Sequence, residues 1–238
     1  MPGASDAGIA SACKTPETVT LPRKNWKVAE RERHRVFITS QATVLETLLK
    51  EVYRRLEGVN PRGLEIHSTL LRCKLFYVIG RKQYATKLEG AVTVGPAAEM
   101  LPIVSCTGWY ERQTWNEFLG ETLSVMVSQL AQNMSVRTGR GIQDQEVFVI
   151  GFHGPRIHIA RALFTADMIS RVHPRGCSRD EVFELKFTRS YDLTLKKDWL
   201  EVTRALARLF RYLLSGHAKV RAIQGYLNRG ELRTGKDI

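Results

Sequence analysis

The sequence lacks the marks of several protein classes. Its four cysteines, Cys13, Cys73, Cys106 and Cys177, are scattered without a close pair, which argues against a disulfide framework and a dedicated zinc cluster. No apolar run approaches the roughly 18 residues that a membrane span needs, and the first residues lack the charged and apolar regions of a signal peptide. We therefore expect a protein of a reducing compartment, the cytoplasm or the nucleus, with no membrane partner.

Motifs of common enzymes are also missing. The chain has no G-x-S-x-G elbow, no kinase catalytic loop and no kinase metal-binding triplet. Gly139-Arg140-Gly141 could present backbone N–H groups and a cation to phosphate, but this loop lacks the length and the Lys-Ser/Thr ending of a P-loop. A turn before a strand is the ordinary use of such glycines. A standard hydrolase or kinase domain is therefore not expected.

Positive charge is what the chain has in excess. It carries 36 Lys and Arg against 24 Asp and Glu, for a formal net charge of +12. Such a balance draws a protein toward polyanions such as nucleic acid, without giving specificity. The hydrophobic fraction of 43% and the charged fraction of 25% are those of an ordinary globular protein. These values predict a folded, basic protein.

Composition divides the chain into three parts. Residues 1–22 are rich in Gly, Ala, Ser, Thr and Pro without periodicity, so we expect a disordered arm that can be removed without unfolding the rest. We expect a single α/β domain over residues 23–227, because the length suffices for one good-sized core. Residues 228–238 are polar and are expected to fray.

Three long helices are predicted from apolar side chains that recur at helical spacing. They cover residues 43–57, 114–134 and 196–215. Thr43 and Glu46 have capping-box spacing at the start of the first helix. Trp199 is expected on the core face of the third helix, together with Val202, Leu206, Leu209, Phe210 and Leu213.

Strands are predicted between these helices. Residues 64–71, 74–79 and 88–94 have β-type composition, whereas the glycine and prolines of residues 95–102 indicate a connecting loop. Apolar runs on both sides of His153-Gly154 predict a β-hairpin that turns there. Residues 182–187 alternate apolar and charged side chains, as a strand with one buried face does. The expected fold class is α/β, with a mixed sheet flanked by the three long helices.

One candidate catalytic group follows from the last of these strands. Glu184 and Lys186 form an E-x-K on its polar face, and Asp167 is the nearest upstream carboxylate. In a metal-dependent phosphodiesterase the two carboxylates would hold Mg²⁺, and the lysine would stabilise charge on phosphate or activate water. An ion pair on a strand, or chance, explains the same pattern. Mg²⁺ is a cofactor only on this alternative interpretation.

Histidines near the hairpin raise the hypothesis of a zinc site. His153, His158, His173 and Cys177 would come together if the hairpin folded over the next loop. Their spacing is not that of a known zinc module, and a lone histidine in a turn or strand is more often structural. We therefore expect no metal here.

The strongest electrostatic feature lies near the C-terminus. Residues 196–238 carry ten Lys or Arg against four Asp or Glu, half of the total net charge. Cations fall opposite the apolar side of the third helix, at helical spacing: Lys197, Arg204, Arg208 and Arg211. Lys219, Arg221, Arg229 and Arg233 would extend them. Phosphate or an acidic protein could dock there, although a solvated helix face explains the pattern as well.

Three segments carry a resemblance to known proteins: Ser128-Gln-Leu-Ala-Gln132, Phe148-Val-Ile-Gly-Phe-His-Gly154 and Leu213-Leu-Ser-Gly216. In this order they resemble lineage-specific proteins of filamentous fungi. More loosely, they are similar to the restriction-endonuclease-like region that precedes fungal-type protein kinase domains, where a helix and a hairpin follow a catalytic-type carboxylate. No acidic-plus-lysine motif stands before Thr114. The resemblance therefore implies a restriction-endonuclease-like fold in a stand-alone, degenerate copy.

These observations favour a non-catalytic binding or interaction protein that presents its basic surface to nucleic acid or to an acidic protein. The alternative is a metal-dependent nuclease of the PD-(D/E)XK type that uses Asp167, Glu184 and Lys186.

Overall fold

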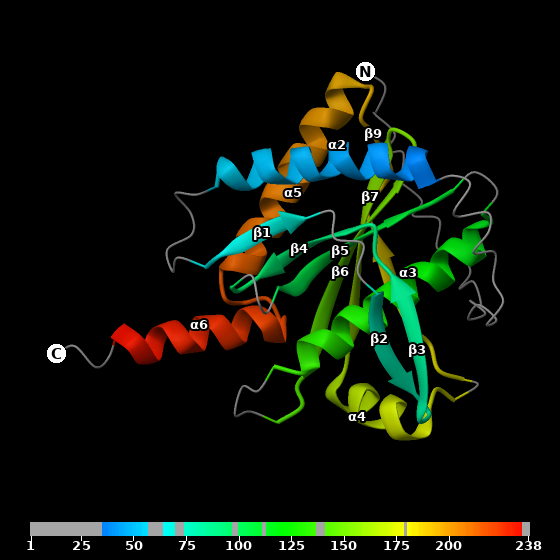
Figure 1. Ribbon diagram of the computed structural model, residues 1–238, viewed down its shortest axis with the longest axis vertical. Helices are drawn as coiled ribbons and strands as arrows, with labels where there is room; N and C mark the ends of the chain where they lie inside the picture. The colour runs from blue at the N-terminus through cyan, green and yellow to red at the C-terminus, as the bar shows by residue number, and fades with distance from the viewer. Residues whose placement is uncertain are drawn as a thin grey trace, which may run out of the picture.

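The computed structural model describes residues 35–56, 64–69, 74–96, 100–110, 113–136, 141–178 and 180–234. The expected arm, residues 1–22, and the expected domain start at residue 23 lie outside these residues. Figure 1 shows a mixed β-sheet with helices on both faces and a separate two-stranded hairpin beside it. The expectation of an α/β fold with a mixed sheet flanked by helices is therefore confirmed.

The main sheet has seven strands. They are β1 Ile66–Thr69, β4 Gly90–Val94, β5 Leu101–Gly108, β6 Gln145–His153, β7 Arg156–Phe164, β8 Leu185–Phe187 and β9 Tyr191–Asp192. Their order is β1-β4-β5-β6-β7-β8, with β9 also paired to β7. β5 and β6 are parallel, and the other pairs are antiparallel. The separate hairpin consists of β2 (Lys74–Ile79) and β3 (Lys82–Lys87).

Each face of the sheet has its own helices and its own core. Helices α2 (Arg35–Arg54), α5 (Lys196–Leu214) and α6 (Arg221–Thr234) contribute to the core on one face. The opposite face carries α3 (Trp115–Met134), with the β2–β3 hairpin and α4 (Ala166–Arg175) packed outside it. Figure 1 shows α4 beside the tip of that hairpin.

The central strand β6 shows why the sheet needs both layers. Its residues point alternately into the two cores: Val147 and Val149 lie on the α3 side, and Phe148 and Ile150 lie on the α2–α5 side. All four are buried. A strand covered on both faces reads as an unbroken apolar run rather than an alternating one.

Strand β5 corrects the expectation of a loop over residues 95–102. Leu101–Gly108 is a strand in the middle of the sheet, and all of its residues are buried. Because both faces are covered, its alternation is confined to the small polar residues Ser105 and Thr107, which are buried and bond Gln129 and Glu121 of α3. Pro102 sits where the register between β4 and β5 shifts, between Val92 and Thr93, and a bulge of this kind tolerates proline.

The first helix also differs from its predicted bounds. Within the described residues α2 covers Arg35–Arg54, so the capping box expected at Thr43 and Glu46 is wrong. Thr43 lies inside the helix, and its hydroxyl donates to the carbonyl of Thr39 at 3.0 Å. Ile38 and Ala42 extend the buried stripe upstream of the predicted start. The second and third predictions correspond closely to α3 and α5.

The hairpin of β6 and β7 is confirmed, with its turn one residue later than predicted. His153 pairs with Arg156, so Gly154 and Pro155 form the loop. Gly154 has a φ of +58°, a conformation that tight hairpin turns require and that glycine adopts without a side-chain clash.

Helices α4 and α6 were not predicted. α4 is short and contains Pro174 in its last turn. α6 extends to Thr234, so part of the expected polar tail, residues 228–238, is helical. No helix in the described part of the chain is both long enough and apolar enough to cross a membrane.

Candidate polyanion-binding face on helix α5

Helix α5 has one side in the core and one side in solvent. Val202, Leu206 and Leu213 are fully buried beneath it. Four cations lie on the opposite side, and all are exposed, as the helical spacing predicts: Lys197, Arg204, Arg208 and Arg211. We call these four residues the basic face. Trp199, expected in the core, is instead 39% exposed, because it lies in the first turn of α5.

Arg204, Arg208 and Arg211 have no acidic partner among the described residues, whereas the charge of Lys197 helps to lower the pKa of the neighbouring Asp198. Among the residues that the structure describes, no ion pair or side-chain hydrogen bond involves any of the four. Arginines on an exposed helix face often form ion pairs with Glu or Asp one turn away. The two carboxylates of α5, Asp198 and Glu201, do not perform that role.

Both carboxylates are taken by an arginine from outside the helix. Arg189, in the segment between β8 and β9, donates to Asp198 Oδ1 at 2.8 Å and also bonds Glu201. Asp198 further accepts a hydrogen bond from the backbone N–H of Asp192 at 2.8 Å. The hydrogen bonds from Arg189, followed by that from Asp192, lower the pKa of Asp198 to about 2. The acidic side of α5 is therefore fixed to the sheet, which leaves the helix cations uncompensated.

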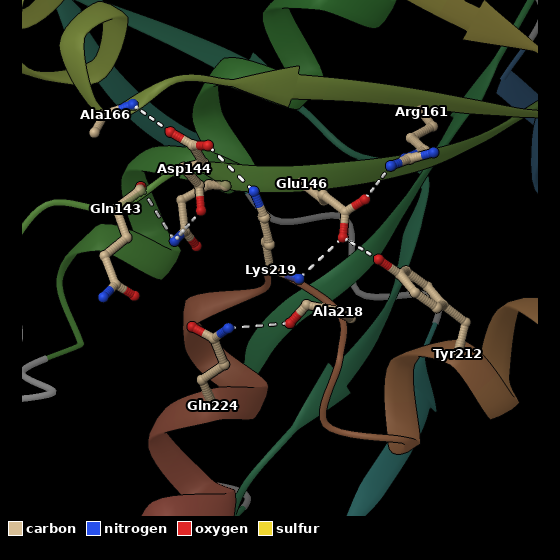
Figure 2. A network of polar contacts seen from close by, with 10 residues as sticks. Gln143, Asp144, Glu146, Arg161, Ala166, Tyr212, Ala218, Lys219 and Gln224 are labelled. Atoms are coloured by element: carbon tan, nitrogen blue, oxygen red, sulfur yellow. Dashed lines mark hydrogen bonds and ion pairs between the residues drawn. The ribbon is translucent and has the colours of Figure 1, made fainter.

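A second carboxylate fixes the C-terminal end of α5. Figure 2 shows Glu146 of β6 accepting hydrogen bonds from Arg161 of β7, from the Tyr212 hydroxyl at 2.6 Å and from the Lys219 backbone N–H at 2.9 Å. The Glu146 side chain is 1% exposed. Three donors thus converge on one buried carboxylate and tie α5 and the turn after it to two strands.

The protonation of this group follows from the same contacts. Burial alone would raise the pKa of Glu146, but the hydrogen bonds from Tyr212 and Lys219 and the charge of Arg161 outweigh it, so the pKa is lowered. Burial, together with the hydrogen bond to this carboxylate, raises the pKa of Tyr212 to about 12. The lowered pKa favours the ionised form of Glu146, whose charge is balanced by Arg161.

The expected extension of the basic face can be followed only at Lys219 and Arg221, and both make contacts within the fold. Lys219 bonds Asp144 at 3.2 Å, as Figure 2 shows. Arg221 donates to the backbone carbonyls of Val136 and Gly141 at 2.7 and 3.2 Å. The side chains of Arg229 and Arg233 lie outside the described residues. Both described cations of the extension are engaged in holding the fold.

The candidate catalytic residues occupy exposed surface ion pairs. Asp167, in the first turn of α4, is 87% exposed and lies 3.7 Å from Arg171. Glu184 is 75% exposed and lies 3.5 Å from Lys186. Within the described ranges, no group of three or more His, Cys, Asp or Glu residues could hold a metal ion. The predicted alternation is confirmed here, because Phe183, Leu185 and Phe187 pack on the core.

The four residues of the considered zinc site have different environments. His158 packs edge-on against Phe118, and burial lowers its pKa to about 4. His153 is exposed at the hairpin turn and packs against Trp109. His173 and Cys177 are exposed near the end of α4. Of the Gly139–Gly141 loop, only Gly141 belongs to the described residues.

Sequence reasoning missed Arg189 and Glu146, the two residues that hold α5 in place. Glu146 and Lys219 are 73 residues apart, and Arg189 and Asp198 are nine apart in irregular chain. Neither spacing belongs to a local motif. No signal in a single sequence distinguishes these residues from other surface charges.

Comparison of the chain with models of protein families, with curated proteins and with solved structures gives no match.

Proposed function

We propose that this chain is a non-catalytic binding protein that uses the basic face of α5 to hold a polyanion, with nucleic acid as the leading candidate. The observation that carries the proposal is that Arg204, Arg208 and Arg211 have no acidic partner within the described part of the chain, where other arginines such as Arg161, Arg171 and Arg189 are paired. An unpaired exposed cation gains more from a phosphate than a paired one, since it breaks no existing contact.

The spacing of these arginines suits a phosphate backbone. Arg204 and Arg211 are seven residues apart, which corresponds to about 10 Å along a helix. Duplex DNA presents about one negative charge per 1.7 Å of its axis, so about six phosphates fall within that length. Three cations in a row can therefore each reach a phosphate without deforming the nucleic acid. Such contacts position a duplex but read no sequence.

A binding role is favoured over the nuclease alternative. Asp167 and Glu184 each face a basic side chain on the surface, and a nuclease needs two carboxylates that share a cation. We propose that the domain is a degenerate relative of the restriction-endonuclease-like region. The succession of helix α3 and the hairpin β6–β7 supports this relationship.

The proposal is tested by binding of a fluorescein-labelled 20-base-pair duplex, followed by fluorescence anisotropy at 50 mM salt. The triple variant Arg204→Gln/Arg208→Gln/Arg211→Gln should bind at least tenfold more weakly, since one phosphate contact contributes about tenfold at this salt concentration. The matched control removes three exposed cations at the end of α2 and just after it that are already paired with carboxylates, in Lys50→Gln/Arg54→Gln/Arg55→Gln.

The control variant should bind within about twofold of the parent protein, because its cations are already neutralised. Equal losses in the two variants would show that net charge, not the basic face, governs binding. If the parent protein binds an acidic peptide but no duplex, the partner is an acidic protein and the nucleic-acid proposal is wrong.

A further inference from the structure

A hollow lies on the other side of the sheet from the basic face. It is bounded by β2, α3, the end of β7, α4 and the segment before β8, and its volume is about 400 Å³. Side chains from each of these segments line it, among them Ile79, Val127, Phe164, Met168, Ile169 and Phe183. No Lys, Arg, Asp or Glu contributes to its lining among the residues that the structure describes. The hollow is therefore mainly apolar, with Tyr77, Ser124, Ser135, His173 and Cys177 as the polar or titratable residues of its lining.

The apolar side of helix α4 faces both the core and this hollow, because Met168 and Ile169 pack against the core and also line the hollow. Met168, Ile169 and Val172 recur at helical spacing and line the hollow. None of the residues of α4 is fully buried. A surface helix ordinarily covers its apolar stripe by packing it on the core, so a stripe left half-covered leaves room for an additional apolar group.

Hydrogen bonds within the chain fix the position of α4, which forms one wall of the hollow. At the C-terminal end of α4, the backbone N–H groups of Gly80 and Arg81 donate to the carbonyls of Val172 and His173 at 3.1 and 3.2 Å. At its N-terminal end, the N–H of Ala166 donates to Asp144 at 3.0 Å. Because α4 is fixed at both ends, the hollow is preformed, as ligand sites usually are.

Two hydroxyl groups of the lining form a hydrogen-bonded pair. The Tyr77 hydroxyl and Ser124 Oγ lie 2.8 Å apart and share one hydrogen bond. Tyr77 is buried, and burial raises the pKa of its phenol. Each hydroxyl has both a donor and acceptor sites, so the pair retains capacity for one further hydrogen bond to a neutral group.

We propose that this hollow binds an uncharged, mainly apolar small molecule that carries one hydroxyl or carbonyl group, oriented by Tyr77 and Ser124. The volume lies within the range of about 300–1,000 Å³ that small-molecule sites occupy. A charged ligand would lose its hydration and find no Lys, Arg, Asp or Glu among the described lining residues, with the His173 imidazole as the only group there that could pair with an anion.

The test uses the full chain and Nile red, an uncharged fluorescent probe of apolar sites, with 1-dodecanol and dodecanoate as competitors. The parent protein should bind one probe per chain, and 1-dodecanol should displace it. Ala131 lines the hollow, so Ala131→Trp should fill it and weaken Nile red binding at least tenfold. Val44→Trp, on the exposed side of α2, adds the same indole away from the hollow and should bind as the parent does.

The polar pair is tested separately. Tyr77→Phe should weaken 1-dodecanol binding about two- to tenfold, the value of one neutral hydrogen bond, while leaving Nile red binding within about twofold. Unchanged Nile red binding in a folded Ala131→Trp variant would overturn the proposal. A stoichiometry of one Nile red per two chains would also overturn it, because that ratio indicates a site between copies. Stronger competition by dodecanoate than by 1-dodecanol would overturn it as well, because it indicates an anion site. The proposal is also wrong if the parent protein binds no Nile red. If a chain without residues 1–34 then binds Nile red, that segment is the occupant of the hollow.

Discussion

The substitution Glu146→Gln tests whether the buried carboxylate holds α5 on the sheet. Glu146 accepts from three donors in Figure 2: Arg161, the Tyr212 hydroxyl and the Lys219 backbone N–H. Glutamine keeps the shape, but it removes the charge and directs an N–H toward at least one of these donors. A hydrogen bond to a charged group contributes about 1.5–3 kcal/mol, and Arg161, which is 49% exposed, can regain water when it loses its anion. We expect a loss of about 1.5–3 kcal/mol in the free energy of unfolding.

Urea denaturation followed by circular dichroism measures this loss. With a slope of about 1–3 kcal/mol per molar urea, the midpoint should fall by about 1 M or more. Glu51→Gln is the matched control, since Glu51 is 41% exposed and pairs with Arg54 and Arg55 on the surface of α2. Exposed pairs of this kind contribute about 0–1 kcal/mol. Equal midpoint shifts in the two variants would refute the reasoning. Arg161→Met should cost less in the Glu146→Gln background than alone, because the two residues share one interaction.

Two further predictions concern acid stability and catalysis. The pKa of Asp198 is lowered from 3.8 to about 2 in the folded chain, so its ion pair stabilises the fold above about pH 4 and is lost as the pH falls toward about 2. The urea midpoint of Asp198→Asn should therefore lie below that of the parent at pH 6 and approach it near pH 2; a gap that does not narrow would contradict the assignment. No Mg²⁺-dependent cleavage of DNA or RNA is expected, and Glu184→Ala should leave nucleic-acid affinity unchanged. Cleavage that disappears in Glu184→Ala would establish the nuclease alternative.

The helices could be predicted where one side of each was apolar. α5 alternates a core stripe with charged residues at helical spacing, and its predicted span differs from the structure by one residue. Strand β5 was harder to find in the same way, because Leu101–Gly108 is buried on both faces and only its small residues Ser105 and Thr107 alternate with apolar ones. Pro102 gave the wrong signal, since the bulge that accommodates it exists only in the assembled sheet.

The basic face could be located from sequence, but its separation from the other cations could not. Composition counts every cation alike, whereas the structure distinguishes cations that are paired with carboxylates from cations that are not paired within the described residues. Arg161 and Arg189 are neutralised by buried or half-buried carboxylates, and Arg204, Arg208 and Arg211 are not. This difference depends on partners that meet only when β6, β7 and α5 assemble. The same holds for the hollow under α4, whose lining residues come from five separate segments.

The salt dependence of duplex binding tests the central claim most directly. A plot of log affinity against log salt concentration has a slope of about −0.9 for each phosphate that the protein neutralises. The account predicts that Arg204→Gln/Arg208→Gln/Arg211→Gln flattens this slope by up to about three units, whereas Lys50→Gln/Arg54→Gln/Arg55→Gln leaves it parallel to that of the parent. Identical slopes for the parent and the α5 variant, or no duplex binding by the parent even at low salt, would contradict it.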